Sequence, residues 1–280
     1  MKFAFYVGFA EKIQELGPAG AAEYALRLGF SGTELLASVQ GGADSLPDMA
    51  TARELHRALK ERGLPMVCCS VYADLWHNPR AEELLLKKAE YTAELECPYL
   101  HHTLFPTYHP GESDPSFEEA LKKVAESAAR IAKHAEKLGV TCLYEDQGAY
   151  FNDIPGYGAL LQTVKESAPA GVCADFGNIL FVNGSPQAFI ENFAADVRHV
   201  HVKDYLLKNG ECSPGMYWLR GSGDLWLRET MVGSGAVDVP ACMQALKAAG
   251  YDGYYALELC HPEPFEDGVR QAMEYLTRFE

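Results

Sequence analysis

The sequence lacks any apolar run long enough to cross a membrane. Nowhere in its 280 residues do about 20 apolar residues follow one another, so we expect no transmembrane helix and no membrane partner. The first ten residues superficially resemble a signal peptide. However, Glu11 and Lys12 end that apolar run, and no A-x-A-like cleavage site follows it. We therefore expect a first β-strand there.

Basic residues are also scarce. The chain has 24 Lys and Arg against 39 Asp and Glu, which gives a formal net charge of −15. A nucleic-acid surface needs clustered positive charge to replace phosphate counterions. We therefore expect no nucleic-acid partner, although a local basic pocket for a small phosphate is compatible with this composition.

The eight cysteines show neither C-x-x-C pairs nor the regular spacing of a disulfide framework. This pattern argues against a structural zinc site or a redox site. Free cysteines in a large chain are typical of a reducing compartment, so we expect a cytoplasmic location.

The sequence does contain a repeated alternation of short apolar segments and longer helical ones. Candidate strands begin near Lys2, Phe30, Pro65, Pro98, Val140, Gly171, Arg198 and Gly253. Expected helices span Ala21–Leu28, Met49–Arg62, Ala81–Glu94, Phe117–Leu138, Gly158–Glu166, Pro186–Phe193, Pro240–Ala249 and Phe265–Phe279. Eight alternating pairs predict an α/β fold, a single TIM-type (β/α)8 barrel, although an open doubly wound sheet shows a similar alternation. No linker or composition change divides the chain, so we expect one domain over residues 1–280.

The widest gap between expected strands runs from Asp204 to Val239. It follows the seventh strand, where barrel enzymes place loops that cover the site. We expect a loop there that contains two tryptophans and two arginines: Trp218, Arg220, Trp226 and Arg228. These side chains could form a lid over a sugar, or could belong to a solvated or oligomer-contact loop.

Four of the expected strands end on a carboxylate or an imidazole: Glu145, Asp175, His201 and Glu258. Side chains alternate along a strand, and Val200 and Val202 form an apolar face suited to packing on helices. His201 must then point into the barrel, and the same reasoning turns the three acids inward. Unpaired acids crowded in a lumen are costly, and one divalent cation removes that cost. Three carboxylates and one imidazole suit Mn²⁺, Mg²⁺, Co²⁺ or Zn²⁺.

Several segments in this order resemble the sugar phosphate isomerase/epimerase family with xylose-isomerase-like barrels. They are Gly29-Phe30-Ser31-Gly32-Thr33-Glu34, Tyr144-Glu145, Ala174-Asp175-Phe176-Gly177-Asn178, His199-Val200-His201-Val202-Lys203-Asp204, Gly233-Ser234-Gly235-Ala236-Val237-Asp238, Ala249-Gly250-Tyr251-Asp252-Gly253 and Leu257-Glu258-Leu259. The resemblance covers nearly the whole chain. Each segment alone has low specificity, but their order and strand-end placement together are specific.

The resemblance implies an enzyme that binds one metal ion through Glu145, Asp175, His201 and Glu258. It further implies that a small carbohydrate, a sugar, sugar phosphate or related hydroxy-carbonyl compound, is isomerised or epimerised there. In that chemistry Glu145 and Glu258 flank the reacting carbon and move the proton through a metal-stabilised enediolate. Manganese is among the metals expected, and a homo-oligomer is compatible because family members often associate.

Two positions depart from the ketose 3-epimerase branch of that family. Asn178 stands where those enzymes have a histidine, and Leu207 stands where they have an arginine. The Lys203-Asp204 ending is more similar to the branch that includes inosose dehydratases. A metal-dependent lyase or dehydratase of that type is therefore the alternative to an isomerase.

Other polar residues near the expected mouth have open roles. His101, Asn178 and Lys203 are candidate substrate-binding residues, although Lys203 could equally form an ion pair with a nearby carboxylate. Glu34 could bind a sugar hydroxyl or form an ion pair across the lumen. His199 lies one layer below His201, so we expect a core histidine there.

Two further functional classes share the barrel. A metal-dependent nuclease related to endonuclease IV needs additional metal ligands and a basic DNA-binding face, and the net charge of −15 argues against it. A barrel that binds a sugar without chemistry is the other class. Loss of metal with unchanged ligand binding would support it.

Overall fold

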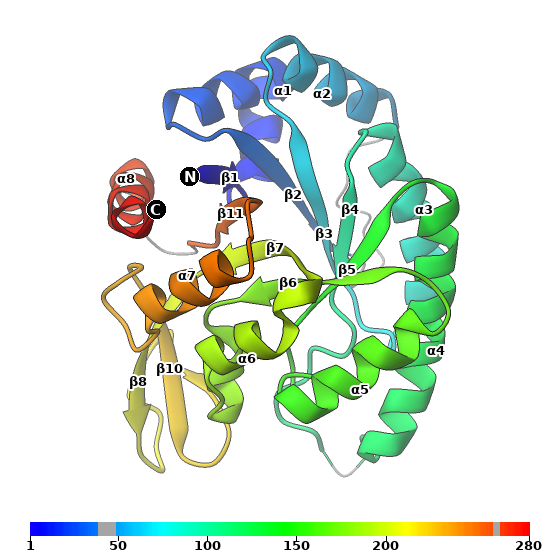
Figure 1. Cartoon of the computed structure of the whole chain (residues 1–280), viewed down its shortest axis with the longest axis vertical. Helices are drawn as coiled ribbons and strands as arrows, with labels where there is room; N and C mark the ends of the chain where they lie inside the picture. The colour runs from blue at the N-terminus through cyan, green and yellow to red at the C-terminus, as the bar shows by residue number, and fades with distance from the viewer. Residues whose placement is uncertain (39–48, 112, 260–263) are drawn as a thin grey trace.

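Eight parallel strands close into a barrel in the computed structural model, which describes residues 1–38, 49–111, 113–259 and 264–280. The order around the barrel is β1-β11-β7-β6-β5-β4-β3-β2 (Figure 1). The barrel strands are β1 (Lys2–Phe5), β2 (Gly32–Ser38), β3 (Met66–Tyr72), β4 (Tyr99–His102), β5 (Thr141–Glu145), β6 (Ala170–Asp175), β7 (Val197–Val202) and β11 (Tyr254–Leu257). The predicted TIM barrel is confirmed, and every strand begins within two residues of its expected start.

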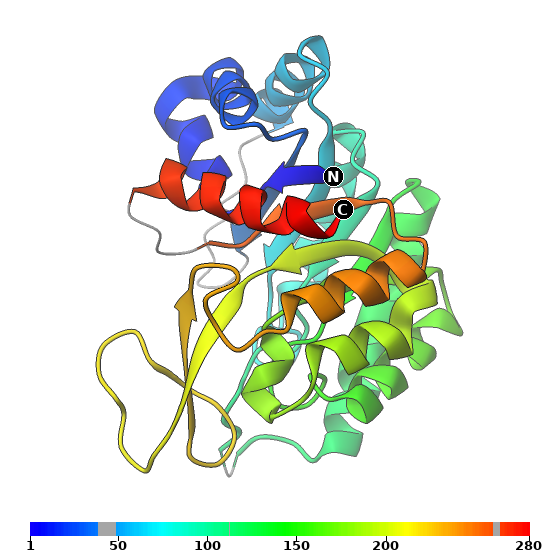
Figure 2. The ribbon, with the colours of Figure 1, turned by 60° about the vertical axis from the view of Figure 1, so that its left-hand side comes forward.

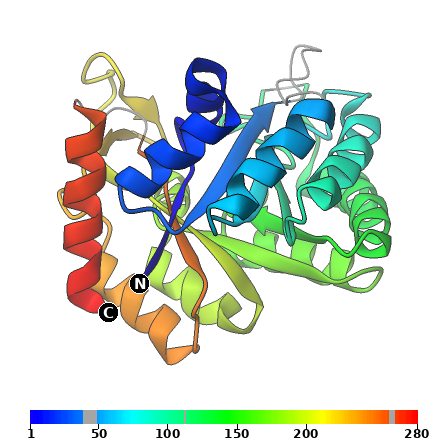
Figure 3. The same cartoon turned by 90° about the horizontal axis from the view of Figure 1, so that it is seen from above.

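The described residues form eight α-helices. Figure 3 shows helices on the outside of the strands. They are α1 (Phe9–Arg27), α2 (Met49–Glu61), α3 (Ala81–Glu94), α4 (Phe117–Lys137), α5 (Ile154–Lys165), α6 (Pro186–Phe193), α7 (Val239–Ala248) and α8 (Phe265–Leu276). Short 3₁₀ turns, η2 (Asn178–Val182), η3 (Ala194–Asp196) and η4 (Thr277–Phe279), join or extend them. Among the described residues, no helix is both long and apolar enough to cross a membrane.

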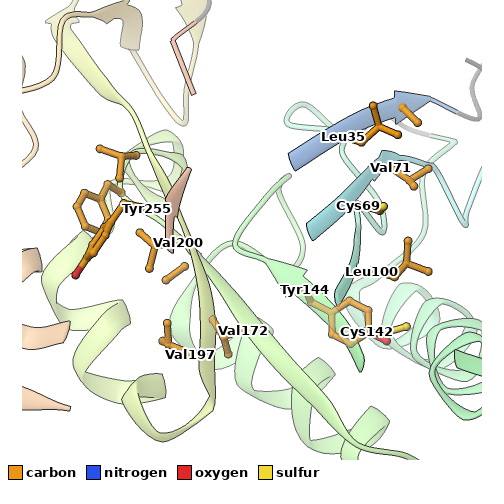
Figure 4. Packing of buried hydrophobic residues seen from close by; sticks show 14 of the residues in the cluster. Leu35, Cys69, Val71, Leu100, Cys142, Tyr144, Val172, Val197, Val200 and Tyr255 are labelled. Carbon is orange, nitrogen blue, oxygen red and sulfur yellow. The ribbon is translucent and has the colours of Figure 1, made fainter. Parts of the chain in front are cut away.

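The predicted alternation along the strands separates the hydrophobic core from the lumen. Val172, Val200 and Leu100 belong to the main core between strands and helices (Figure 4). Smaller side chains of the same strands, such as Cys173 and Ala256, fall in two separate clusters inside the barrel. Every second residue therefore points into the lumen, where polar side chains at the strand ends share one space.

Local caps fix where several helices begin. Ser116 caps α4, since its hydroxyl accepts from the backbone N–H of Glu119, and the Glu119 carboxylate accepts from that of Ser116. Asp153 caps α5 by accepting from the N–H of Gly156, so this helix begins at Ile154, four residues before its expected start.

The first helix differs most from its prediction. Helical structure was expected only over Ala21–Leu28, whereas α1 runs from Phe9 to Arg27 with an interior break at Gly17. Gly17 has φ 70° and ψ 169°, and Pro18 follows it. Proline disfavours the helical conformation in the residue before it, which explains the break at Gly17. The residues before this break are nevertheless helical, which was not predicted.

The expected loop after β7 is instead mainly a three-stranded antiparallel sheet, which corrects that prediction. Its strands are β8 (Asp204–Asn209), β9 (Leu219–Arg220) and β10 (Leu225–Thr230), in the order β8-β10-β9. We call these three strands the side sheet. It projects away from the barrel, in yellow (Figure 2).

The first residue of the side sheet also anchors the segment that returns to the barrel. The Asp204 carboxylate accepts from four backbone N–H groups, those of Tyr205, Gly233, Gly235 and Val237, at 2.8–3.0 Å. A Cβ atom added at Gly235 would collide with this carboxylate. Glycine is therefore required at this close approach.

The barrel has a cavity at the N-terminal ends of its strands. A cavity of about 540 Å³ opens at the N-terminal ends of the strands, and its lining includes Lys2, Tyr99, Arg198 and Tyr254. This face lies at the other end of the barrel from the C-terminal ends of the strands.

The seven cysteines in the described part of the chain are free.

Candidate metal and catalytic site

Four adjacent strands bring the predicted metal ligands together. Ligand atoms of all four residues lie within 4.8 Å of one another: Glu145, Asp175, His201 and Glu258. Glu145 and Asp175 end β5 and β6, and Glu258 directly follows β11. Asp175 pairs in register with His201 across β6 and β7, so their side chains enter the lumen at the same level. The cluster lies at the C-terminal ends of the strands, where barrel enzymes have their active sites.

His201 lies at the centre of this cluster. Its Nδ1 is 2.7 Å from Oε1 of Glu145 and 3.5 Å from Oε2 of Glu258. The Tyr6 ring stacks on the imidazole at 4.6 Å between centroids. The histidine is fully buried, and its ring plane is held by contacts on a face and on both nitrogens.

Lys203 places an ammonium beside two of the acids. Its Nζ lies 2.7 Å from Oε1 of Glu258, 3.3 Å from Oδ2 of Asp175 and 3.2 Å from Oδ1 of Asn178. Burial alone would lower the pKa of Lys203, but Asp175 and Glu258 raise it well above the ordinary value. Lys203 therefore forms the ion pair that was one of its two predicted roles, and it also contacts Asn178.

The acids differ in how readily they ionise. Burial raises the pKa of Asp175 to about 7, with Lys203 opposing the shift and Glu145 adding to it. Burial likewise raises the pKa of Glu258. For Glu145, burial works against the charge, but the hydrogen bond from His201 and the nearby positive charge lower the pKa to about 2. The cluster thus crowds acids that cannot all ionise easily on their own.

Two carboxylate oxygens in the cluster are buried without a hydrogen-bond partner among the described residues: Oδ2 of Asp175 and Oε2 of Glu258. The other oxygen of Asp175 is fixed, since it accepts from the N–H groups of Gly177 and Asn178 at 2.7 Å. Each of the two unpartnered oxygens has a cationic neighbour: Nζ of Lys203 lies 3.3 Å from Oδ2 of Asp175, and Nδ1 of His201 lies 3.5 Å from Oε2 of Glu258. Carboxylate oxygens that are close together and not used in hydrogen bonds are suited to a hard divalent cation. The donor set therefore fits the expected metal.

Two other groups of side chains also have ligand atoms close enough for an ion. One is His101, Cys173 and His201, but burial raises the pKa of the Cys173 thiol, and metals bind the thiolate. The other is Glu34, His199 and His201, whose atoms already form short hydrogen bonds with one another. The chemistry of the donors favours the four-residue cluster.

Glu34 lies in β2, on the far side of the lumen, and takes the second of its predicted roles. Its Oε2 is 2.6 Å from Nε2 of His199, and its Oε1 is 2.9 Å from Nε2 of His201. Ser70, from β3, donates its hydroxyl to the same carboxylate. His199 is buried, as expected for a core histidine, but it also belongs to this polar network.

His101 and Asn178 flank the acids. His101 is buried in β4, with Nε2 at 3.8 Å from Oε2 of Glu145 and Nδ1 at 2.8 Å from Oγ of Ser70. Burial lowers the pKa of His101 to about 3, so its ring is neutral. Two neighbours of this site, Tyr6 and Ser70, were not singled out from the sequence. Tyr6 directly follows the first strand, a position that could have indicated it.

The aromatic and basic residues of the segment after β7, for which a lid was one of two alternatives, contact the side sheet or its surroundings. The Arg228 guanidinium lies over the ring of Trp218 at 5.3 Å. Trp226 donates its indole N–H to the carbonyl of Gly210, and the Arg220 carbonyl lies 2.8 Å from Nε2 of His109. None of these described contacts reaches the four-residue cluster.

Solved structures with the same fold cover almost the whole chain. The 3-keto-D-glucoside 4-epimerase from E. coli is 18% identical, with a TM-score of 0.74, and 99% of each chain is covered. The IolI protein with a bound zinc atom is 16% identical, with a TM-score of 0.74, and 100% of this chain and 99% of that one are covered.

A probable 3-DHS dehydratase from Bacillus anthracis is similar to the same degree. It is 16% identical, with a TM-score of 0.74 and 99% of each chain covered. These structures include enzymes of two reaction classes and one zinc-binding protein, and at such identities they show the fold alone.

No curated protein matches the chain in sequence. The family model described as xylose isomerase-like TIM barrel matches residues 22–279, which is nearly the whole chain. This match, the closed barrel and the similar solved structures agree with the resemblance seen in the sequence. The chain belongs to the xylose isomerase-like TIM barrel family.

Proposed function

We propose that the chain is a metal-dependent isomerase or epimerase of a sugar, sugar phosphate or related hydroxy-carbonyl compound. The observation that carries the proposal is the convergence of three acids and one imidazole, from four strands, within 4.8 Å of one another. Similarity to a 3-keto-D-glucoside 4-epimerase supports a carbohydrate substrate.

Glu145, Asp175, His201 and Glu258 would hold one divalent ion. When bound, such an ion polarises a substrate carbonyl and stabilises the negative charge that develops on it. Asp175 and His201 are fully buried, so they would hold the ion without being accessible to a substrate. The side chain of Glu258 is 19% exposed against 4% for Glu145, so Glu258 is the more accessible of the two glutamates to a substrate.

In this proposal the two glutamates exchange a proton with carbon atoms of the substrate. One carboxylate removes the proton next to the carbonyl, and the other returns or relays it. Lys203, between Glu258 and Asp175, would donate to a substrate oxygen. Asn178 and His101 would contact hydroxyl groups, and both have a buried nitrogen without a hydrogen-bond partner among the described residues, Nδ2 of Asn178 and Nε2 of His101.

A dehydratase is the second candidate. The similar fold of a probable 3-DHS dehydratase and the Lys203-Asp204 ending favour it. The same base would remove the proton, and water would leave from the neighbouring carbon instead of the proton returning.

Metal content tests the site first. We expect purified protein to contain one divalent ion per chain by elemental analysis, and Glu145→Gln to lose most of it. Glu118→Gln, on the exposed surface of α4, is the matched control and should keep the ion. Unaltered protein that takes up no divalent ion, or an unaffected Glu145→Gln variant, would contradict the proposal.

The reaction class is tested with the ion found. The loaded protein is incubated with ketoses, sugar phosphates and inososes in D₂O. Deuterium on a substrate carbon without net elimination supports the isomerase or epimerase, whereas a dehydrated product supports the second candidate. Unchanged substrates throughout the panel, with ligand binding that survives metal removal, would indicate a sugar-binding barrel without chemistry.

A further inference from the structure

We propose that Glu34 is a positioning residue that sets the tautomers of two histidines facing the site, His201 directly and His101 through Ser70. The proposal rests on the proposed function, because it treats His201 as a metal ligand. Glu34 touches neither the reacting atoms nor the proposed ion, and it acts through its hydrogen bonds.

The Glu34 carboxylate is fully buried and surrounded by donors. It comes from β2, and its partners come from β3 and β7, so it spans the lumen. His201 and His199 contact its two oxygens through Nε2, at 2.9 and 2.6 Å, and Ser70 donates its hydroxyl to it. A buried charge with this many donors is well satisfied and holds its partners in place.

This arrangement decides which nitrogen of His201 carries hydrogen. An ionised carboxylate can only accept, so Nε2 of His201 must donate to Glu34. Without an ion, Nδ1 of His201 carries a hydrogen as well and donates it to Glu145. A bound ion would replace that hydrogen, and the neutral His201 would then present the lone pair of Nδ1 to the ion. That nitrogen lies 2.7 Å from Oε1 of Glu145 and 3.5 Å from Oε2 of Glu258, among the other proposed ligands. In metal sites a carboxylate commonly accepts from the ring nitrogen that does not bind the metal, and this hydrogen bond fixes the tautomer of the imidazole.

The same reasoning extends to His101 by one step. A serine hydroxyl has one hydrogen, and Ser70 gives it to Glu34. The Ser70 oxygen must then accept from Nδ1 of His101, 2.8 Å away. The lone pair of neutral His101 is left on Nε2, which lies 3.8 Å from Oε2 of Glu145 and has no hydrogen-bond partner among the described residues. His101 can therefore accept from a substrate hydroxyl.

A second ion held by Glu34, His199 and His201 is the competing interpretation, since their ligand atoms are close enough. It would remove the hydrogens from the short contacts that Glu34 makes with both imidazoles. Elemental analysis separates the two ideas, because two ions per chain would overturn the positioning role.

Histidine tautomers can be read directly. Protein labelled with ¹⁵N in histidine is loaded with Zn²⁺, and two-bond ¹⁵N–¹H spectra report which ring nitrogen carries hydrogen. We expect hydrogen on Nε2 of His201 and on Nδ1 of His101, assigned with the His101→Asn and His199→Asn variants. Hydrogen on Nδ1 of His201, or on Nε2 of His101, would overturn the proposal without any change at Glu34.

Two variants test the cause. Glu34→Gln keeps the shape of the side chain, but its amide NH₂ group must face a hydrogen-bond donor. We therefore expect an altered His201 tautomer and a Co²⁺ affinity that is weaker by about 10–100-fold. Ser70→Ala leaves the contact between Glu34 and His201. It should alter the His101 signals while Co²⁺ affinity stays close to that of the unaltered protein.

The outcomes separate the two proposals. If unaltered protein binds no ion, the proposed function fails, and the His101 tautomer in metal-free protein still tests Glu34. If unaltered protein binds one ion and Glu34→Gln binds Co²⁺ with the same affinity and the same absorption spectrum, the positioning role fails and the proposed function stands.

Discussion

Lys203 carries a positive charge into a lumen crowded with acids. Its ammonium lies within 3.3 Å of oxygens of both Glu258 and Asp175, and it is almost completely buried. Removing one partner of a buried ion pair leaves an uncompensated charge, which is far more costly than loss of a surface pair.

We expect Lys203→Met to lower the free energy of unfolding of metal-free protein by about 3–5 kcal/mol. Saturating Mn²⁺ should recover part of that loss, because the ion supplies the missing positive charge. Urea unfolding with and without Mn²⁺ measures both effects. Lys60→Met, which removes an exposed pair with Glu96, is the control and should cost about 0–1 kcal/mol. A loss that Mn²⁺ does not reduce would contradict this account.

His102 shows a different consequence of burial. It points away from His101, packs edge-on against Tyr144 and contacts the carbonyl oxygen of Thr103 through Nδ1. Burial lowers its pKa to about 4, although the contact with Thr103 opposes the shift. The folded protein thus binds this proton less readily than the unfolded chain, whose histidine pKa is about 6.5.

The fold should therefore lose stability as the pH falls from about 6.5 toward 4, because the unfolded state takes up the proton first. Between pH 7 and pH 5 this residue should account for about 2 kcal/mol of the loss. His102→Gln does not titrate, so its denaturation midpoint should fall less over the same range. Parallel midpoint changes in the two proteins would refute the assignment to His102.

At the scale of elements, one carboxylate joins the side sheet to the segment that returns to the barrel. Each oxygen of Asp204 accepts from two backbone N–H groups, and three of the four donors belong to the segment that leads back to α7. An amide at this position would place an NH₂ group against two donors. Hydrogen bonds to a charged acceptor contribute about 1.5–3 kcal/mol each.

We expect Asp204→Asn to destabilise the protein by at least about 2 kcal/mol and to raise hydrogen exchange in β8 and β10 before the barrel strands are affected. Gly235→Ala should act similarly, because its Cβ would meet the Asp204 carboxylate. Gly210→Ala is the control, since the nearest atom to its Cβ is 3.9 Å away. Unchanged exchange in the side sheet would argue against this anchor.

Strands and helices with a clear hydrophobic pattern or a clear capping residue were predictable from the sequence. The barrel strands and most helices begin within a few residues of their expected positions, because buried parallel strands are continuous apolar runs and helices α4 and α6 have capping residues. The side sheet was not predictable. Its strands are short and mix charged, aromatic and aliphatic residues, and their antiparallel pairing joins β8 to β10, which are separated by a long connection.

The candidate site was predictable only in part, because some of its contacts join residues that are far apart in the sequence. Strand order and alternation indicated that Glu145, Asp175, His201 and Glu258 face the lumen. The contact between Glu34 and His201 joins residues 167 positions apart across the closed barrel, so no local pattern reveals it. The position of Lys203 between two acids likewise follows from barrel closure.

At the scale of the whole molecule, the proposed ion should stabilise the fold. A ligand that binds only the folded state at 100 times its dissociation constant adds about 2.7 kcal/mol, a rise of about 5 °C in melting temperature for a chain of this size. We expect metal-stripped protein to melt lower and to recover with added Mn²⁺. Glu145→Gln should show no such recovery, and a melting temperature independent of Mn²⁺ in unaltered protein would contradict a folded-state site.

Lys203 and Asp204 are consecutive residues with separate attachments. The Lys203 side chain enters the cluster of acids, and the Asp204 side chain accepts from the segment that returns from the side sheet to the barrel. A single peptide unit therefore connects the projecting strands to the only lysine that the described residues place among these acids. A substitution that displaces the backbone at Asp204 would therefore also displace the residue that carries this ammonium.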